Sequence, residues 1–258
     1  PNESFERIYD DILNIEDLTN SQVMALIDKL TDLRDDNYLF IHSINTGMLL
    51  QLCADWYNLE PHIKKELAIA GLLHDIGKTK IFNNSYLDNK KPHTRSEMKI
   101  FKKHPTFGYQ YLKDNVFMTD LILDGVLLHQ ERLDGSGYPF GLKKDKLSFY
   151  TKLISIVDSF DMLTVRHNDS RDRSPLNALV KLRDLGMKNK LDISLVLSFI
   201  DNITDYYIGS RVLLSDDRTG RIIFIENNYP ADPVVYLDNG EYINLKEEQI
   251  ELLSCKIK

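Results

Sequence analysis

The stretch Ala68-Ile69-Ala70-Gly71-Leu72-Leu73-His74-Asp75-Ile76-Gly77-Lys78 joins an apolar run to an imidazole, a carboxylate, a glycine and an amine. This order predicts a buried helix that presents two metal-type ligands at its C-terminal end and stops at Gly77. Neighbouring helical residues point about 100° apart. His74 and Asp75 can therefore share one ion only near a helix end, or with Asp75 between two ions. A core histidine beside a capping aspartate would explain the pair equally well.

Length and composition restrict the class of protein. The 258 residues, 43% of them apolar, suffice for one large domain or a domain with a small appendage. A formal charge of −7 argues against a DNA-binding protein that works through a basic face. The two cysteines, Cys53 and Cys255, are too few for a disulfide framework and suit a reducing compartment. No apolar run approaches the roughly 18 residues of a membrane span, so we expect a cytoplasmic protein.

Apolar periodicity predicts a mainly helical chain with a C-terminal antiparallel β domain. Helices are expected at residues 3–13, 21–34, 40–56, 61–74, 94–104, 105–113, 119–131, 150–163, 174–186 and 192–203. Short β-branched segments, separated by turn-forming residues, follow at 211–214, 221–226, 234–237, 241–245 and 250–256. We therefore predict a helical domain at residues 1–205, which includes N-terminal helices within 1–36, and a small barrel-like β domain at 206–258.

Histidines on predicted helices are the candidate functional residues of the helical part. Four of the seven histidines lie on predicted helices among apolar residues: His42, His74, His104 and His129. Any one of them could equally be a core residue. Together with Asp75 and Asp158, however, they would leave many buried polar groups unpaired, which is costly. Convergence on a metal satisfies all of them, and a set of imidazoles and carboxylates without thiolates suits iron, manganese or zinc.

Four motifs in chain order resemble the HD-GYP domain, a branch of the HD phosphohydrolase superfamily. They are His74-Asp75-Ile76-Gly77-Lys78, then His104-Pro105-x-x-Gly108, then His129-x-Glu131-Arg132-x-Asp134-Gly135-x-Gly137-Tyr138-Pro139, and Val157-Asp158-x-Phe160-Asp161-x-Leu163-Thr164. The likeness runs from residue 38 to residue 203, and the tail from Gly209 is similar to a β appendage found after some of these domains. The resemblance implies an HD-type helical bundle that holds two divalent ions, iron or manganese.

The resemblance also assigns roles by position. One ion would be held by His42, His74, Asp75 and Asp158. Asp75 would bridge to a second ion held by His104 and His129. Lys78 and Asp75 would be the catalytic residues. The predicted substrate-binding residues are Lys78, Arg132, Gly137, Tyr138, Pro139, Arg166, His167 and Arg171.

The activity implied by the resemblance is hydrolysis of cyclic di-GMP, through pGpG to GMP. A phosphodiester anion repels hydroxide, so the reaction needs charge neutralisation and a nucleophile formed near neutral pH. Two ions about 3.5–4 Å apart would withdraw charge from a bridging water and clamp the phosphoryl oxygens. Lys78 would add positive charge where negative charge builds up. The expected partner is a cyclic dinucleotide, and the sequence leaves a protein partner or a homodimer open.

Three positions depart from the family's pattern. Typical members have a second histidine where this chain has Gln130, and an amide is a poorer ligand for iron or manganese, so we expect a weakened second site. Tyr38 takes the place of a glutamate that members with three ions carry, which predicts that no third ion binds. The segment 167–169 aligns with an Arg-Pro-Tyr segment that helps to hold the dinucleotide, and Arg166 or Arg171 would substitute for its arginine.

These departures leave two alternatives to cyclic di-GMP hydrolysis. One is hydrolysis of another cyclic dinucleotide. The other is a degenerate signalling or binding module with weak or no catalysis, in which the loop at residues 134–139 persists only as a turn. The number of bound ions separates them, because two ions favour the enzyme and one or none favours the module.

Overall fold

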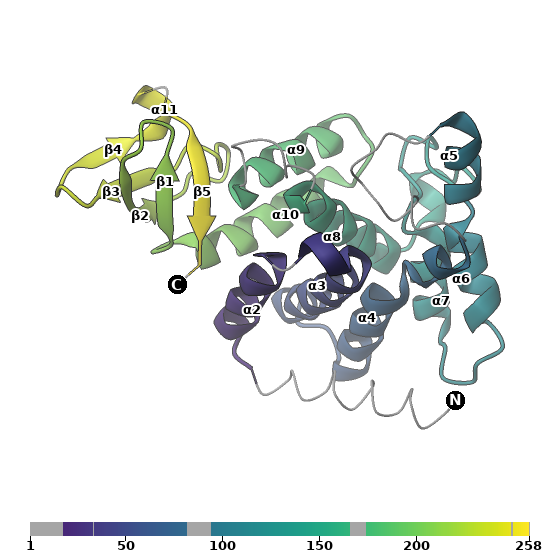
Figure 1. The fold of residues 1–258 in the computed structure, drawn as a ribbon. Helices are drawn as coiled ribbons and strands as arrows, with labels where there is room; N and C mark the ends of the chain where they lie inside the picture. Colours follow the sequence, from purple (N-terminus) through teal and green to yellow (C-terminus); the bar gives the residue numbers. More distant parts are fainter. Residues whose placement is uncertain (1–17, 33, 82–93, 166–173, 249, 258) are drawn as a thin grey trace.

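A computed structural model describes residues 18–32, 34–81, 94–165, 174–248 and 250–257. Helices occupy the larger part of the molecule and a sheet lies at one end (Figure 1). The α-helices before the sheet are α2 (Asn20–Asp32), α3 (Arg34–Trp56), α4 (Pro61–Leu73), α5 (Arg95–Phe101), α6 (His104–Leu112), α7 (Asp120–Leu128), α8 (Phe149–Val165), α9 (Pro175–Met187) and α10 (Ile193–Thr204). The 3-10 helices are η2 (Ile76–Lys80), η4 (Lys144–Lys146) and η5 (Asp205–Tyr207). The predicted mainly helical class is confirmed.

Five strands form one antiparallel sheet in the order β4-β3-β2-β1-β5. They are β1 (Arg211–Leu214), β2 (Thr219–Phe224), β3 (Val234–Leu237), β4 (Tyr242–Asn244) and β5 (Leu252–Lys256). The fourth predicted strand was expected to continue to Leu245, but there the helix α11 (Leu245–Glu248) begins. The Asn244 side-chain oxygen accepts a hydrogen bond from the backbone N–H of Lys246 at 3.2 Å, as a helix cap does.

Several predicted helix ends differ from the observed ones, since α5 ends at Phe101 rather than at residue 104 and α7 ends at Leu128 rather than at residue 131. α3 begins at Arg34 rather than near residue 40. α4 ends at Leu73, and Asp75, with φ −100° and ψ 5°, leads into η2 instead of continuing the helix. The prediction that Gly77 stops the helix is therefore wrong. Gly77 is required by a close approach, since a Cβ there would overlap the backbone oxygen of His104 and lie 2.6 Å from the backbone nitrogen of Gly108.

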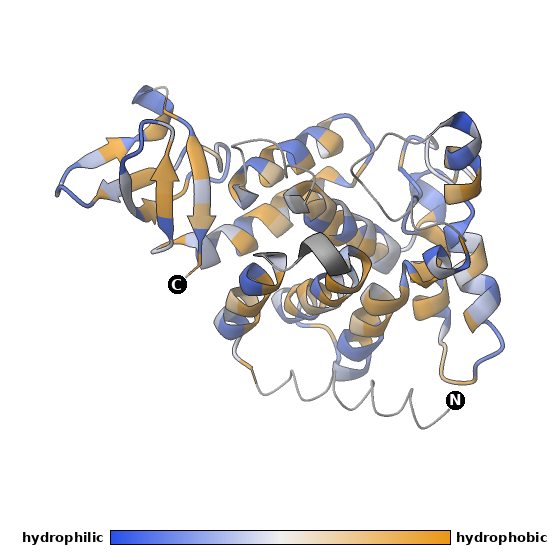
Figure 2. Cartoon of the chain, in the orientation of Figure 1, coloured by the Kyte–Doolittle hydropathy of each residue, from blue (hydrophilic) through white to orange (hydrophobic). Residues whose placement is uncertain are grey.

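One hydrophobic core runs through the helices into the sheet. Figure 2 shows apolar residues along the inner faces of the helices and along the strands. Leu49 of α3, Phe199 of α10 and Val212 of β1 belong to the same buried cluster. Trp56 packs against this cluster, and its indole N–H donates to the hydroxyl of Tyr206, in the 3-10 helix η5 that precedes the sheet, at 3.3 Å. The domain boundary near residue 206 stays a prediction.

Some expectations fall on residues outside the described ranges. These are the helix at 3–13 and the substrate-binding residues Arg166, His167 and Arg171. Within the described ranges, every helix is too short or too polar to cross a membrane.

Candidate metal centre

The crossing of α3 and α4 brings two histidines together. A Cβ on Gly71 would lie 2.8 Å from the Cα atom of Gly47, so the two helices touch backbone to backbone at these glycines. His42 lies on α3 before this contact and His74 caps the end of α4 after it. Their Nε2 atoms are 3.0 Å apart.

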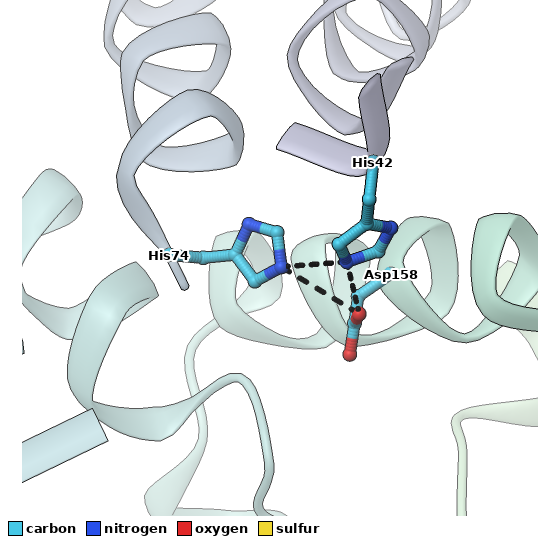
Figure 3. Close-up of side chains that lie close together, drawn as sticks. All are labelled: His42, His74 and Asp158. Carbon is cyan, nitrogen blue, oxygen red and sulfur yellow. Dashed lines mark hydrogen bonds and ion pairs between the residues drawn. The ribbon is translucent and has the colours of Figure 1, made fainter. Parts of the chain in front are cut away.

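Asp158 of α8 completes a first group with these two histidines (Figure 3). Its Oδ1 atom lies 3.2 Å from Nε2 of His42 and 3.6 Å from Nε2 of His74. The two rings and the carboxylate come from three different helices and point toward one another in the close-up. All three residues are buried, at 0%, 0% and 3% exposure.

A second group surrounds Asp75. Its Oδ1 atom lies 3.2 Å from Nε2 of His104 and 3.7 Å from Nε2 of His129. Its Oδ2 atom faces the first group, 3.5 Å from Nε2 of His42 and 3.4 Å from Nε2 of His74. By ligand-atom spacing, His74 belongs with Asp75 and His129 as well as with the first group. Asp75 therefore lies between two pairs of imidazoles.

The helix ends fix the ring orientation of three histidines. The last carbonyl groups of a helix lack an intrahelical donor. The Nδ1–H groups of His74, His104 and His129 each donate to the carbonyl three residues earlier, at 2.6, 2.9 and 3.0 Å. With Nδ1 donating to a carbonyl, the Nε2 atom of each ring points into the centre and offers a lone pair whenever that ring is neutral.

His42 is oriented by a carboxylate instead. Its Nδ1 atom lies 2.6 Å from Oδ2 of Asp161, one turn after Asp158 on α8. The other oxygen of Asp161 accepts a hydrogen bond from the Asn45 amide at 3.1 Å. A carboxylate behind a ligand histidine fixes its tautomer and strengthens it as a ligand.

Charge also favours a cation at this centre. Burial alone would raise the pKa of Asp75, but Lys78 and His74 hold that pKa well below its usual range. Burial opposes a charge on His74, yet the Asp75 and Asp158 carboxylates raise its pKa to about 10. Burial lowers the pKa of His129 to about 4, so its ring stays neutral. The buried carboxylates therefore require positive charge nearby.

The environment of the Asp75 Oδ1 atom indicates that these residues fit metal ions. Asp75 Oδ1 is buried and has no hydrogen-bond donor among the described residues. The atoms nearest to it include Nε2 of His104, whose own N–H is on the opposite side of the ring. Lone pairs that face each other repel unless a cation lies between them. The donor set consists of nitrogen and oxygen only, which suits divalent transition metals.

The predicted catalytic residue Lys78 lies at this centre. It is on η2, is 7% exposed, and its ammonium group donates to Oδ2 of Asp75. The ammonium group also lies 5.3 Å from the centroid of the Phe101 ring. Lys78 is thus held beside the carboxylate that faces both groups of histidines.

The loop after His129 folds back on the centre. Glu131, 1% exposed, accepts hydrogen bonds from the backbone N–H groups of residues 140, 141 and 142, at 2.7, 3.1 and 2.9 Å. Gly137 lies close against the backbone before it, since a Cβ there would overlap the Cα atom of Glu131 and lie 2.6 Å from the backbone oxygen of Gln130. Tyr138 consequently lies near the candidate metal ligands, with its ring centroid 6.1 Å from that of His104.

The remaining predicted site residues lie as follows. Arg132 donates to the backbone oxygens of His129 and Glu131, at 3.0 and 2.8 Å, so its guanidinium group braces the start of the loop. Pro139 is half-buried in the loop. The Tyr38 ring stacks on the His42 ring with a centroid distance of 5.7 Å. The roles assigned to these residues stay predictions.

Two residues with a clear part in the site had been given no role from the sequence. Asp161 and Glu131 are buried carboxylates that hold His42 and the loop, respectively. A signal for Asp161 was present, because it follows Asp158 by three residues and the two carboxylates therefore share one face of the helix. Glu131 could have been noticed as a carboxylate placed directly before a glycine-rich loop.

Comparisons with known proteins identify the fold and family. A solved structure, an HDG"Y"P protein from Bdellovibrio bacteriovorus, is similar with a TM-score of 0.53 and 20% identity, over 64% of this chain and 52% of that chain. A cyclic di-GMP phosphodiesterase of Pseudomonas aeruginosa is 30% identical over 73% of this chain and 45% of its own length. A 3'3'-cGAMP-specific phosphodiesterase of Vibrio cholerae is 28% identical over 76% of this chain and 44% of its own length.

This chain spans about half the length of these curated relatives. The HD domain family is matched over residues 19–195, more than half of the 258 residues, and this range contains every residue of the metal-type centre. The predicted place in the HD phosphohydrolase superfamily is confirmed: the chain belongs to the HD domain family.

Proposed function

We propose that this protein is a metal-dependent phosphodiesterase that hydrolyses a cyclic dinucleotide, with cyclic di-GMP, cleaved through pGpG to GMP, as the first candidate. The observation that carries the proposal is the position of Asp75, which turns one carboxylate oxygen toward each pair of buried imidazoles. The activities named for the relatives of Pseudomonas aeruginosa and Vibrio cholerae support the same reaction class.

The proposed cofactors are two divalent ions, iron or manganese. His42, His74 and Asp158 would hold one ion, His104 and His129 the other, and Asp75 would reach both. When bound, such ions supply Lewis acidity, which neutralises the phosphodiester charge and makes a water molecule more acidic. The tautomers fixed by the helix ends already aim the ring lone pairs for this task.

Lys78 would stabilise the charge that develops on the phosphoryl group. Its ammonium group is nearly buried beside Asp75, where few water molecules compete with it. A fixed positive charge in such a position acts on the transition state without reorganisation.

The substrate would enter beside Tyr138. This ring offers an aromatic surface next to His104, and the ammonium group of Lys102 lies 5.2 Å from its centroid. Lys102 is exposed on the surface beside this ring. It is therefore suited to contact the second phosphate or a base, a role for which the sequence pointed to Arg166, His167 and Arg171.

The test combines metal analysis with turnover. Protein purified without oxygen and loaded with iron or with manganese is expected to bind two ions and to convert cyclic di-GMP to GMP. Protein stripped by a chelator should lose turnover and regain it when metal is returned. Two bound ions without turnover of any cyclic dinucleotide would contradict the proposal and favour the binding module.

A second candidate substrate is cyclic GMP–AMP, because the Vibrio cholerae relative is named as specific for it. The ratio of kcat/KM for the two dinucleotides decides between them. The cytoplasmic location and the protein partner or homodimer left open by the sequence stay predictions.

A further inference from the structure

Gln130 follows a predicted metal ligand, yet its side chain contacts the other half of the centre. The backbone turns after His129, the C-cap of α7. The Gln130 side-chain nitrogen Nε2 then donates a hydrogen bond of 3.1 Å to Oδ2 of Asp158 on α8. His129, by contrast, lies with Asp75 in the second group.

The chemistry of the pair fixes which end of the amide faces Asp158. An ionised carboxylate only accepts hydrogen bonds, so the Gln130 group that faces it must be the NH2 donor. Asp158 is a proposed ligand of a divalent ion, and a carboxylate binds such an ion in its ionised form. The amide oxygen of Gln130, the atom that could bind a cation, consequently points away from this contact.

The hydrogen bond uses the Asp158 oxygen that the histidines do not. Oδ1 faces Nε2 of His42 at 3.2 Å and Nε2 of His74 at 3.6 Å. Oδ2 is the oxygen bound to Gln130. Gln130 therefore holds the carboxylate plane so that Oδ1 is presented to the first group.

We infer that Gln130 is a positioning residue for the metal group of His42, His74 and Asp158, and that it is not a ligand of the ion at His104 and His129. The inference rests on the proposed metal centre. It changes the expectation from the sequence, in which Gln130 weakens the second site.

The experiment assigns the effect of Gln130 to one group. Binding of Mn²⁺ to metal-free protein is measured by calorimetric titration in two backgrounds. In the His104→Ala protein the second group is weakened, so the titration measures the first group. In the His42→Ala protein the first group is weakened, so the titration measures the second group. Gln130→Met, which keeps the length of the side chain and removes its donor, is then added to each background.

We expect Gln130→Met to lower Mn²⁺ affinity in one of the two backgrounds only. Hydrogen bonds that orient a ligand typically contribute 10–100-fold to metal affinity. Gln130→Met should therefore lower Mn²⁺ affinity by about 10–100-fold in the His104→Ala protein and leave it unchanged in the His42→Ala protein. Gln130→Asn retains the amide but is one methylene shorter, so it should behave like Gln130→Met and serves if that variant folds poorly.

A matched control separates this role from a general structural one. Gln110 is an exposed glutamine on α6, so Gln110→Met makes the same chemical change away from the centre and should leave both affinities unchanged. Loss of affinity in the His42→Ala background alone, or no loss in either background, would overturn the inference. These titrations need no substrate, so wild-type protein that binds two ions and hydrolyses nothing would contradict the proposed function and leave this inference standing.

Discussion

Asp75 is the residue on which both groups of histidines converge, because its two oxygens face different imidazole pairs. We predict that Asp75→Asn lowers the metal content of the purified protein at both positions, since a neutral amide binds divalent cations poorly and cannot balance their charge. Elemental analysis of protein purified without oxygen measures the content. Asp145→Asn, at an exposed position on η4, is the control and should keep the wild-type content. A full complement in Asp75→Asn would show that Asp75 does not bridge.

The sequence predicts which residues form the centre. It predicts only some of the hydrogen bonds that hold their side chains. Apolar surroundings marked out His42, His74, His104 and His129. Three of them donate to a carbonyl three residues earlier, an arrangement that is local and could be anticipated wherever an apolar helix ends in histidine. The contact between Gln130 and Asp158 joins residues 28 positions apart, so only the fold could reveal it.

Among the elements, the α3–α4 crossing sets the spacing of the first metal group. We predict that Gly71→Ala destabilises the protein and weakens metal binding there. The new Cβ would lie 2.8 Å from the backbone of Gly47 and 2.7 Å from Leu50 Cδ1, so the helices must separate. Overpacking costs about 1–3 kcal/mol, and the better helix propensity of alanine offsets up to about 1 kcal/mol of this.

Urea unfolding of metal-free protein measures the change in the free energy of unfolding for Gly71→Ala, and Mn²⁺ titration measures the affinity. Gly125→Ala on α7 is the matched control, because the nearest atom to its Cβ would be Ile154 Cδ1 at 2.8 Å, the far end of a flexible side chain that can move, while Ala70 Cβ would lie 3.0 Å away. Equal effects of the two substitutions would show that the backbone contact between α3 and α4 does not control the centre.

The loop that carries Tyr138 depends on the Glu131 carboxylate. We predict that Glu131→Gln raises KM for the cyclic dinucleotide while the metal content stays unchanged. The glutamine amide supplies one acceptor oxygen and one donor group, whereas three backbone N–H groups need acceptors, so buried donors are left unpaired and the loop loosens. Kinetics and elemental analysis on the same preparation check both parts. Loss of metal without a change in KM would show that Glu131 supports metal binding and does not hold the loop.

The periodicity of apolar residues predicted the long helices. It did not predict the conformation of the connecting segments next to the centre. The apolar spacing of α4, α8 and α10 is a property of each segment alone. The short helix η2 depends instead on the contact of Gly77 with residues of α6, which are more than 25 positions away in the chain. Such long-range backbone contacts leave no periodic signal, and the sequence therefore suggested a plain helix stop at Gly77.

On the scale of the whole molecule, the helices and the sheet share a core. Val212, Leu214 and Ile222 of the sheet pack in the same buried cluster as Phe199 and Ile203 of α10. Hydrogen bonds reinforce this contact, since Asn227, in the loop after β2, donates to Asp201 at 2.9 Å. Unfolding of the sheet alone would expose the apolar face of α10, at about 1.5–3 kcal/mol for each large side chain. The two parts should therefore unfold together.

We predict one cooperative thermal transition that shifts as a whole when metal binds. Trp56, the single tryptophan, packs against the buried cluster that the helices and the sheet share, and it stacks on Tyr206 of η5 with a centroid distance of 6.3 Å. Its fluorescence midpoint should coincide with the midpoint from calorimetry. Metal at about 100 times its Kd adds about 2.7 kcal/mol to the free energy of unfolding, which corresponds to roughly 5–10 °C in Tm for a chain of this size.

The decisive comparison is between metal-free and metal-loaded protein, followed by both methods. The candidate metal groups lie in the helical part, and in the described part of the chain the sheet holds none of them. A sheet that unfolds independently would therefore keep its own midpoint when metal is added. A calorimetric peak that stays in place on metal loading, beside one that shifts, would show that the sheet unfolds independently. A single peak that moves with the Trp56 signal would show that metal binding in the helical part stabilises the sheet through the shared core.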